Sequence, residues 1–215
     1  MCYNTNVKGG KSVFDHGAFL VDGVSDSGFT ALFDTNVSYE MFLFFWYYID
    51  MEKKIHLEKI LWDECDKITK LKVNKDQKTF VAPNADSLID AYFAITEEGM
   101  KVYPFGIYYG KKAVGFIMIT FDCPWATKYY GLPEKFYYIW RFMIDKKYQG
   151  QGFGKEALRL AIEFVKTFPA GKSEACWLSY EPENEGARSL YLKAGFVERL
   201  DLYKEDMEIP AVLKL

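Results

Sequence analysis

The chain has 215 residues, which suits one domain with a sizeable core plus an extension. Half of its residues are hydrophobic and 18% are aromatic, a composition that excludes a disordered or fibrous protein. The formal net charge is -3. Residues 1–50 hold two Lys and six acidic residues and contribute a charge of -4, while the other 25 basic and 24 acidic residues contribute +1. Without a basic cluster, the charge predicts neither nucleic-acid nor membrane binding.

The cysteines and the most apolar run indicate the cellular location. Four scattered cysteines without a Cys-x-x-Cys pair predict no metal site and are typical of reduced intracellular thiols. The run 41–49 is too short to span a bilayer, and its acidic flanks, Glu40 and Asp50, do not resemble a signal peptide. We therefore expect a cytoplasmic protein.

Residues 1–50 differ in character from the rest of the chain. They contain no Arg and end in an aromatic run, whereas a typical start of a folded protein follows Met51. Two interpretations stay open. In the first, Met51 is the natural start and residues 1–50 are translated upstream DNA. In the second, residues 1–50 are a real extension that packs against the domain or a partner. In both cases we expect the main domain over residues 51–215.

From Met51 onward the pattern is mixed α and β. The first expected elements are a strand over 54–60 and a helix over 63–73 with an Asp suited to capping. A second helix is predicted over 84–96, with one apolar face formed by Leu88, Ile89 and Tyr92.

The middle of the chain predicts the core of a sheet. Strands over 105–109 and 113–121 are joined by Gly110-Lys111-Lys112, a hairpin signal. Residues 123–135, with two Pro and one Gly, predict an irregular loop. The nearly all-apolar segment 136–144 predicts a central strand buried on both faces.

The last third of the chain alternates helix and strand. An amphipathic helix is predicted over 155–168, because Leu158, Ala161, Ile162 and Val165 fall on one face. A strand over 175–180 and a helix over 185–194 closed by Gly195 follow. Two final strands are predicted around 196–203 and 209–215.

The segment from Gln149 to Lys155 (QGQGFGK) is the most informative one. It lies between a buried strand and an amphipathic helix, where glycines let the backbone approach a ligand closely. The N–H groups and dipole of the following helix then form an anion site suited to a pyrophosphate. The spacing fits neither a P-loop nor the dinucleotide fingerprint, so the loop alone also allows a simple tight turn.

Two motifs resemble those of the GNAT acetyltransferase superfamily. Gln149, Gly152 and Gly154 match its motif A after a strand, and a second set matches its motif B: Asn184, Ala187, Leu190, Tyr191, Gly195 and Phe196. The resemblance covers residues 54–215. It implies an α/β (α+β) fold with a mixed, mostly antiparallel sheet and about four helices. The sheet is expected to splay between the strands that end near Ile144 and Tyr180.

The same resemblance assigns the site. Acetyl-CoA, as the acetyl donor, would bind to the strand and loop residues Phe142, Met143, Ile144, Gln149, Gly150, Gln151, Gly152, Phe153, Gly154 and Lys155, with Asn184 on its arm. Tyr191 would be the general acid that protonates the leaving thiolate. A bland reading also exists for Tyr191, since it is one of 16 Tyr residues and could pack in the core.

Three strings, over 77–84, 140–145 and 179–184, resemble bacterial spermine/spermidine (diamine) acetyltransferases. These enzymes acetylate a primary amine of a polyamine by direct transfer. A polyammonium chain needs carboxylates and aromatic faces, for which we expect Glu181, Phe80, Tyr138 and Trp140. Some relatives carry an acidic residue at the position of Trp140. Its absence here leaves the catalytic base unassigned, and a water relay to Glu181 is one hypothesis.

Other functions remain open at the level of sequence. The acceptor could be an antibiotic amine or a protein N-terminus, and fold similarity alone does not separate these. From other classes, the chain could be a non-catalytic CoA-binding module or an adaptor that docks through residues 41–49. Since many relatives dimerise, a homodimer is expected alongside the small-molecule acceptor.

Overall fold

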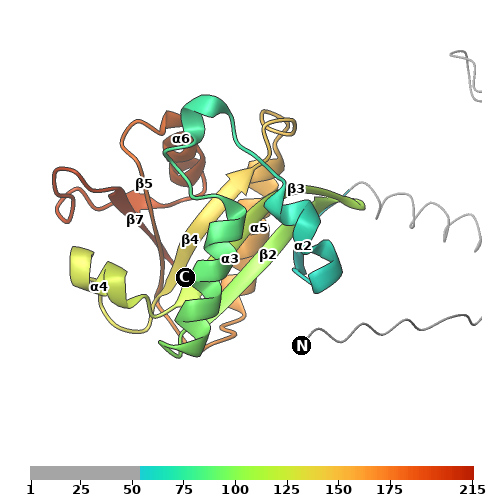
Figure 1. Ribbon diagram of the computed structural model, residues 1–215. Coiled ribbons are helices and arrows are strands. Elements are labelled where there is room, and N and C mark those ends of the chain that lie inside the picture. The colour runs from blue at the N-terminus through green and yellow to red at the C-terminus, as the bar shows by residue number, and fades with distance from the viewer. Residues whose placement is uncertain (1–53) are drawn as a thin grey trace, which may run out of the picture. The chain divides into compact units, whose positions relative to one another are not determined.

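The computed structural model describes residues 54–215, so the expectations for residues 1–50 and for a start at Met51 lie outside the described residues. The described elements, in chain order (Figure 1), are β1 (Ile55–Lys59), α2 (Trp62–Thr69), a 3-10 helix (Lys75–Gln77), α3 (Asn84–Thr96), β2 (Lys101–Tyr109), β3 (Lys112–Phe121), α4 (Pro124–Tyr130), β4 (Tyr137–Ile144), α5 (Phe153–Lys166), β5 (Ala175–Tyr180), α6 (Glu185–Lys193), β6 (Val197–Glu198) and β7 (Ile209–Lys214).

One seven-stranded sheet organises these elements, in the order β1-β2-β3-β4-β5-β7-β6. Every neighbouring pair is antiparallel except β4 and β5, which run parallel. Their pairing covers only Tyr137–Ile139 opposite Cys176–Leu178, although β4 continues to Ile144 and β5 to Tyr180. The predicted mixed, mostly antiparallel sheet that splays between these two strands is confirmed.

The sheet buries a separate core on each face. Helices α2, α3 and α4 cover one face, and α5 and α6 cover the other. In Figure 1, α2 and α3 lie in front of the strands and α5 lies behind them. Because successive side chains of a strand point to opposite faces, Tyr137 and Ile139 belong to the α5 side and Tyr138 to the α3 side. The prediction of a doubly covered central strand is therefore confirmed for the first half of β4.

The helix predicted over 63–73 ends at Thr69, earlier than expected. Lys72 has left the helix because its backbone pairs with the segment after β4. Its N–H donates to the Asp145 carboxylate at 2.8 Å, and its carbonyl accepts from the Lys146 N–H at 2.9 Å. These tertiary hydrogen bonds replace the last helical turn.

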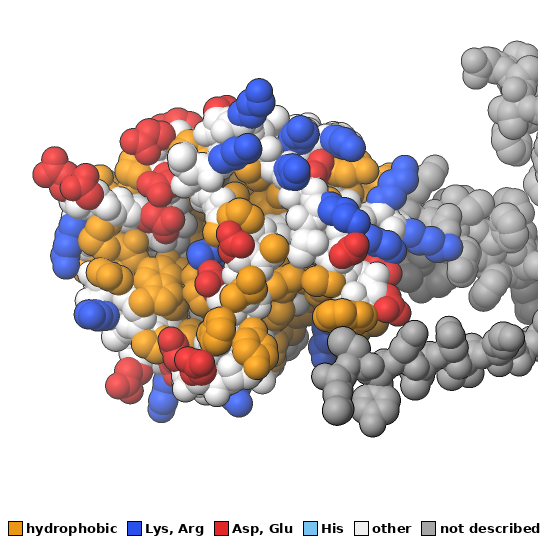
Figure 2. Space-filling view, viewed as in Figure 1, with side chains coloured by type: hydrophobic (Ala, Val, Ile, Leu, Met, Phe, Trp, Pro, Cys, Tyr) orange, Lys and Arg blue, Asp and Glu red, His pale blue; other side chains and the backbone are white. Residues whose placement is uncertain are grey.

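Helix α3 has the predicted bounds, but its predicted apolar face is right only for Leu88, which packs on the core, and wrong for the other two residues. Ile89 and Tyr92 are 55% and 62% exposed, while the small residues Ser87, Ala91 and Ala94 are buried. Small side chains let the helix lie close to the sheet, so the large ones project outward. Figure 2 shows the resulting apolar side chains gathered over this helix.

The loop predicted over 123–135 contains a helix, α4. Pro124 occupies its first turn and Gly131, at φ 66°, ends it, which is the usual place of each residue at helix ends. The predicted strand over 196–203 is also too long, since only Val197–Glu198 pairs with β7. Five α-helices are described, where about four were expected.

No helix in the described part of the chain is long and apolar enough to cross a membrane. Residues 54–215 also contain no group of three His, Cys, Asp or Glu side chains that could hold a metal ion. Cys65, Cys123 and Cys176 are free thiols.

Candidate active site

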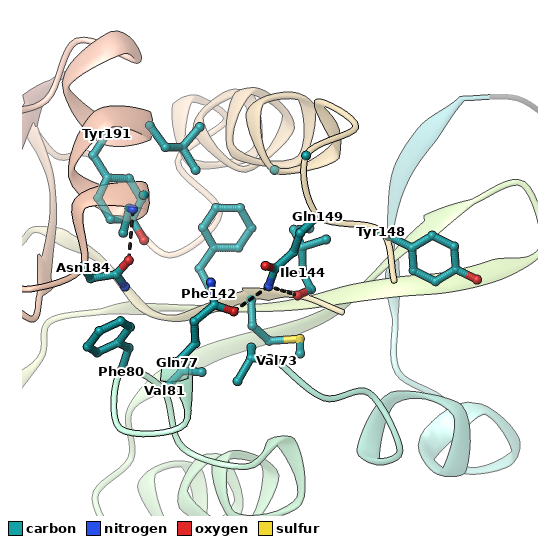
Figure 3. A pocket seen from close by; sticks show the side chains of 16 residues that line it. Val73, Gln77, Phe80, Val81, Phe142, Ile144, Tyr148, Gln149, Asn184 and Tyr191 are labelled. Carbon is teal, nitrogen blue, oxygen red and sulfur yellow. Dashed lines mark hydrogen bonds between the residues drawn. The ribbon is translucent and has the colours of Figure 1, made fainter. Parts of the chain in front are cut away.

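A cavity of about 290 Å³ opens where β4 and β5 diverge, and we call it the glycine-loop cavity. Figure 3 shows Asn184 and Tyr191 at one end, Gln77 and Gln149 toward the other, and Phe142 between them. Its lining comes from four segments far apart in the sequence: Val73, Gln77, Phe80 and Val81; Phe142, Met143 and Ile144; Tyr148, Gln149, Gly150 and Gly154; and Asn184, Gly186, Ala187, Leu190 and Tyr191.

The segment from Gln149 to Lys155, which we call the glycine loop, contains backbone conformations that only glycine adopts easily. Gly150 and Gly152 have φ values of 76° and 81°, and Gly152 is the N-cap of α5. Open space surrounds both Cα atoms, so nothing blocks a ligand from approaching the backbone. The first N–H groups of α5 have no intrahelical acceptor, which makes this loop suited to an anion.

The change Gly152→Ala is expected to destabilise the fold by about 1–2 kcal/mol, because an alanine is strained at positive φ. Distortion of the loop should weaken coenzyme A binding about tenfold, which corresponds to about 1.4 kcal/mol. Thermal unfolding and calorimetric titration measure the two effects. Gly154→Ala is the matched control for stability, since its new Cβ would have only ordinary contacts, 3.6 Å or more from its neighbours. Equal stability of the two variants would contradict this account.

Gln149 ties three segments together through its side chain. Its Nε2 donates to Gln77 Oε1 at 2.8 Å and to the Ile144 carbonyl at 2.9 Å, and its Oε1 accepts from Asn74 Nδ2 at 3.0 Å. The dashed lines in Figure 3 mark the first two of these bonds. The predicted contact of Gln149 with a cofactor therefore falls to its backbone, because the side chain is used to hold the cavity wall.

We expect Gln149→Ala to lower the free energy of unfolding by about 2 kcal/mol, since it removes two partly buried hydrogen bonds and one exposed one. It should also raise the KM for acetyl-CoA. Gln151→Ala is the control, because Gln151 is exposed and donates only to the Lys147 carbonyl. Chemical denaturation of both variants gives the comparison, and a Gln149→Ala protein as stable as Gln151→Ala would exclude the anchoring role.

The strand β4 offers a free backbone edge to the cavity. Its register against β3 shifts between Ile139 and Arg141, which leaves Trp140 as a bulge residue. From this bulge to Ile144, β4 has no pairing with β5. A ligand with amide groups could therefore add to this edge as a strand would.

Asn184 and α6 form the wall opposite the glycine loop. The Asn184 Oδ1 accepts from the Ala187 N–H at 3.1 Å and so caps α6. Its amide nitrogen has no hydrogen-bond partner within residues 54–215 and lines the cavity as a donor.

Tyr191 contributes a polar group to the end of the cavity next to Asn184. It is 6% exposed, and its hydroxyl has no hydrogen-bond partner in the part of the chain that the structure describes. Burial, with smaller effects of Glu208 and Tyr180, raises the pKa of this phenol above its usual range. The hydroxyl therefore keeps its proton at neutral pH and can act as a hydrogen-bond donor in the cavity.

A second cavity of about 190 Å³, the Glu208 cavity, lies on the other side of Tyr191. The two cavities share Phe80, Val81, Phe142, Asn184, Ala187 and Tyr191. Trp140, Arg141, Ser179, Tyr180 and Glu208 line the second cavity alone, with Thr79, Ala82 and Ile139. The buried phenol thus stands where the two spaces meet.

Most of the predicted site residues come together. The glycine-loop cavity contains Phe80, Phe142, Met143, Ile144, Gln149, Gly150, Gly154, Asn184 and Tyr191, and the Glu208 cavity adds Trp140. Gln151, Gly152, Phe153 and Lys155 belong to the loop without lining either cavity. Phe153 turns into the core, where its ring stacks on Tyr109 at 4.9 Å.

Two predicted acceptor residues lie elsewhere. Tyr138, expected as an aromatic wall, is 1% exposed and packs edge-on against Trp125 in the core, because strand alternation turns it toward α4. Glu181 is half-buried just after β5 and lines neither cavity. Burial raises the pKa of Glu181, and the carboxylates of Glu208 and Glu183 raise it further.

Sequence reasoning missed Gln77, Tyr148 and Glu208. Gln77 ends the 3-10 helix and begins the string 77–84, but neither motif A nor motif B includes it, and the other two follow no recognised spacing. The pairing of β5 with β7 brings Glu208 to the site, but this pairing is known only from the structure.

The rim of the glycine-loop cavity is basic. Lys72, Lys75 and Lys78 precede α3, and Lys146 and Lys147 follow β4; most of these side chains are exposed. Figure 2 shows Lys and Arg side chains gathered over the 3-10 helix and the β4–α5 loop. A charged rim of this kind attracts an anionic ligand such as one with several phosphates.

Comparisons with known proteins agree with this geometry. Residues 56–196 match the family model described as acetyltransferase (GNAT) family. The spermine/spermidine N(1)-acetyltransferase of Bacillus subtilis strain 168 is 31% identical over 150 residues, which cover 66% of this chain and 87% of that protein. The probable spermine N(1)-acetyltransferase of B. subtilis subsp. natto has the same identity and coverage.

Solved structures share the fold at low identity. An acetyltransferase of Thermus thermophilus has a TM-score of 0.55 at 14% identity and covers 75% of this chain and 97% of its own. The PaiA N-acetyltransferase of Thermoplasma acidophilum, in complex with coenzyme A, has a TM-score of 0.52 at 14% identity, covering 75% and 99%.

Proposed function

On the premise that this chain belongs to the GNAT acetyltransferase family, we propose that it transfers the acetyl group of acetyl-CoA to a primary amine of a polyamine such as spermidine or spermine. The family itself accounts for N-acetyl transfer from acetyl-CoA. The polyamine acceptor is the finer proposal, and it rests on the names of the two B. subtilis relatives and on the charges of the acceptor side.

The chain's own residues fit acetyl-CoA. The glycine loop and the first N–H groups of α5 would hold the pyrophosphate, and the basic rim around Lys75 and Lys146 would attract the phosphates. The free edge of β4 and the amide nitrogen of Asn184 would bind the arm. When bound, this cosubstrate supplies the acetyl thioester at the junction of the two cavities.

Tyr191 carries the proposal for the transfer step. The acceptor nitrogen, as the neutral amine formed when its ammonium group loses a proton to solvent, would reach the junction from the Glu208 cavity and form its bond to the acetyl carbon as the carbon–sulfur bond breaks. The proton that the departing sulfur needs is held by the Tyr191 phenol, and the phenolate regains a proton from the nitrogen through solvent. The observation that carries this proposal is a largely buried tyrosine whose hydroxyl has no partner within the described residues and which lines both cavities.

The acceptor side favours a cation. Glu208 lines the second cavity, and Glu181 and Glu183 follow β5 beside it. The ring of Trp140 also lines this cavity, but the Arg141 guanidinium already lies over that ring, 5.3 Å from its centroid, so the carboxylates carry the argument for a cation. These features support an amine with several positive charges over a neutral acceptor.

The test is thiol release from acetyl-CoA by the full chain, with spermidine, spermine, an aminoglycoside or a peptide N-terminus as acceptor, followed by mass spectrometry of the product. We expect release that depends on the polyamine and an acetylated polyamine as product. If thiol release depends on the aminoglycoside or the peptide instead, that compound becomes the acceptor, and the assignment of the chain as an acetyltransferase stands. A chain that binds coenzyme A but acetylates none of them would favour the non-catalytic module.

A further inference from the structure

Two carboxylates face each other at the ends of β5 and β7. The antiparallel register pairs Tyr180 with Ile209 and Ser179 with Pro210. Continued by one step, the same register places Glu181 opposite Glu208. Burial raises the pKa of Glu181, and the nearby Glu208 carboxylate raises it further. Like charges at such a pair are unfavourable unless a cation lies near them.

Glu208 is held in place by a chain of partly buried hydrogen bonds. Its Oε2 accepts a hydrogen bond from Ser179 Oγ, and a carboxylate can only accept. Ser179 therefore donates to Glu208 and accepts a hydrogen bond from the Tyr138 hydroxyl, 2.6 Å away. The backbone carbonyl of Glu208 also accepts from Tyr130, at 3.2 Å. This network fixes the carboxylate at the cavity wall.

The charge of Glu208 has no basic partner within residues 54–215. Arg141, the basic residue in the cavity lining, pairs with groups other than Glu208, although its Nε has no hydrogen-bond partner within the described residues. Its guanidinium lies 3.5 Å from the Asp90 carboxylate and over the Trp140 ring, 5.3 Å from the ring centroid. The carboxylate pair is therefore left for a ligand.

An independent observation also points to a ligand in this cavity. The Tyr191 side chain is more than nine-tenths buried, lines the cavity and has an unpartnered hydroxyl within the described residues. From this convergence we infer that Glu208, opposite Glu181, binds the ammonium group of the acceptor beside Tyr191 and makes the site selective for cationic amines. The inference rests on the proposed function and adds the residue that recognises the acceptor.

The experiment compares Glu208→Gln with Glu205→Gln in the full chain. Both changes remove one negative charge from the segment before β7, but Glu205 is exposed and lines neither cavity. Spermidine binding is measured by calorimetry in the presence of coenzyme A, and the KM values for spermidine and acetyl-CoA by thiol release. We expect Glu208→Gln to weaken spermidine binding and raise its KM about tenfold or more, as loss of a charged hydrogen bond does. The KM for acetyl-CoA should not change.

Equal spermidine affinity of Glu208→Gln and wild type, in a wild-type chain that acetylates spermidine, would overturn this inference alone. A wild-type chain that binds spermidine through Glu208 without acetylating it would overturn the proposed function alone. A chain that binds no spermidine overturns both. If Glu208→Gln fails to fold, Ser179→Ala keeps the charge but removes its anchor, and an unchanged spermidine KM in that variant counts against the inference.

Discussion

Replacing Tyr191 by phenylalanine is expected to lower kcat for amine acetylation about 100-fold or more, which is the lower range for loss of a general acid. The ring would stay in place, since it packs near Phe142 and Phe196 with centroids 6.5 and 6.0 Å away. Only the hydroxyl is lost, and it has no hydrogen-bond partner within residues 54–215. Stability should therefore be nearly unchanged. Steady-state thiol release and thermal unfolding measure the two quantities.

The matched control is Tyr129→Phe, the same chemical change at a side chain that is 53% exposed on α4. It should turn over at the wild-type rate. Binding of coenzyme A to Tyr191→Phe, measured by calorimetry, should match the wild type, which separates proton donation from binding. Unchanged kcat in a folded Tyr191→Phe protein would rule out the general-acid role and return Tyr191 to the core.

Replacing Gly115 by alanine is expected to have the largest effect on stability, a loss of about 3 kcal/mol. A Cβ at Gly115 would lie 2.5 Å from the carbonyl oxygen of Met143 and 2.9 Å from Ile144 Cδ1. The first neighbour is backbone of the adjacent central strand and cannot rotate away. Because Met143 and Ile144 line the glycine-loop cavity, the displacement of β4 should also weaken acetyl-CoA binding.

Gly186→Ala is the control with the opposite sign. Gly186 lies in α6, where a new Cβ would meet only Asn184 Oδ1, at 3.8 Å. Alanine is favoured over glycine in a helix by about 1 kcal/mol, so this variant should be as stable as the wild type or more stable. Chemical denaturation of the pair checks both signs. A Gly115→Ala protein as stable as wild type would mean that β4 can move without cost.

The local patterns of the sequence were sufficient for most of the sheet and for the glycine loop. β5 and α3 have the predicted bounds. The signals that were sufficient act within a few positions, such as the turn at Gly110 between β2 and β3 and the residues before Asn84 at the start of α3. The errors come from long-range partners. Lys72 leaves the helical path for Asp145, and Ile89 points outward because Ser87 and Ala91 pack on the sheet.

The candidate site divides in the same way. Motif spacing brought together the loop from Gln149 and the helix of Tyr191, since each motif lies within one strand–loop–helix unit. The acceptor side depends on a pairing between β5 and β7, which are separated by α6 and β6 in the chain. No local pattern near Glu208 reports that pairing. Tyr138 was misplaced for the related reason that periodicity does not say which face of a strand a helix will cover.

The brief pairing of β4 with β5 also bears on how cooperatively the protein unfolds. Strands β5 and β7 with α6 join the rest of the sheet through Tyr137–Ile139 alone. Native-state hydrogen exchange should therefore report two cooperative units, with amides of β5 and β7 opening at a lower free energy than those of β3. A ligand that spans the split contacts both units, so its binding free energy would be added to the weaker of the two. In this protein, substrate occupancy would then determine whether the sheet unfolds in one step or two.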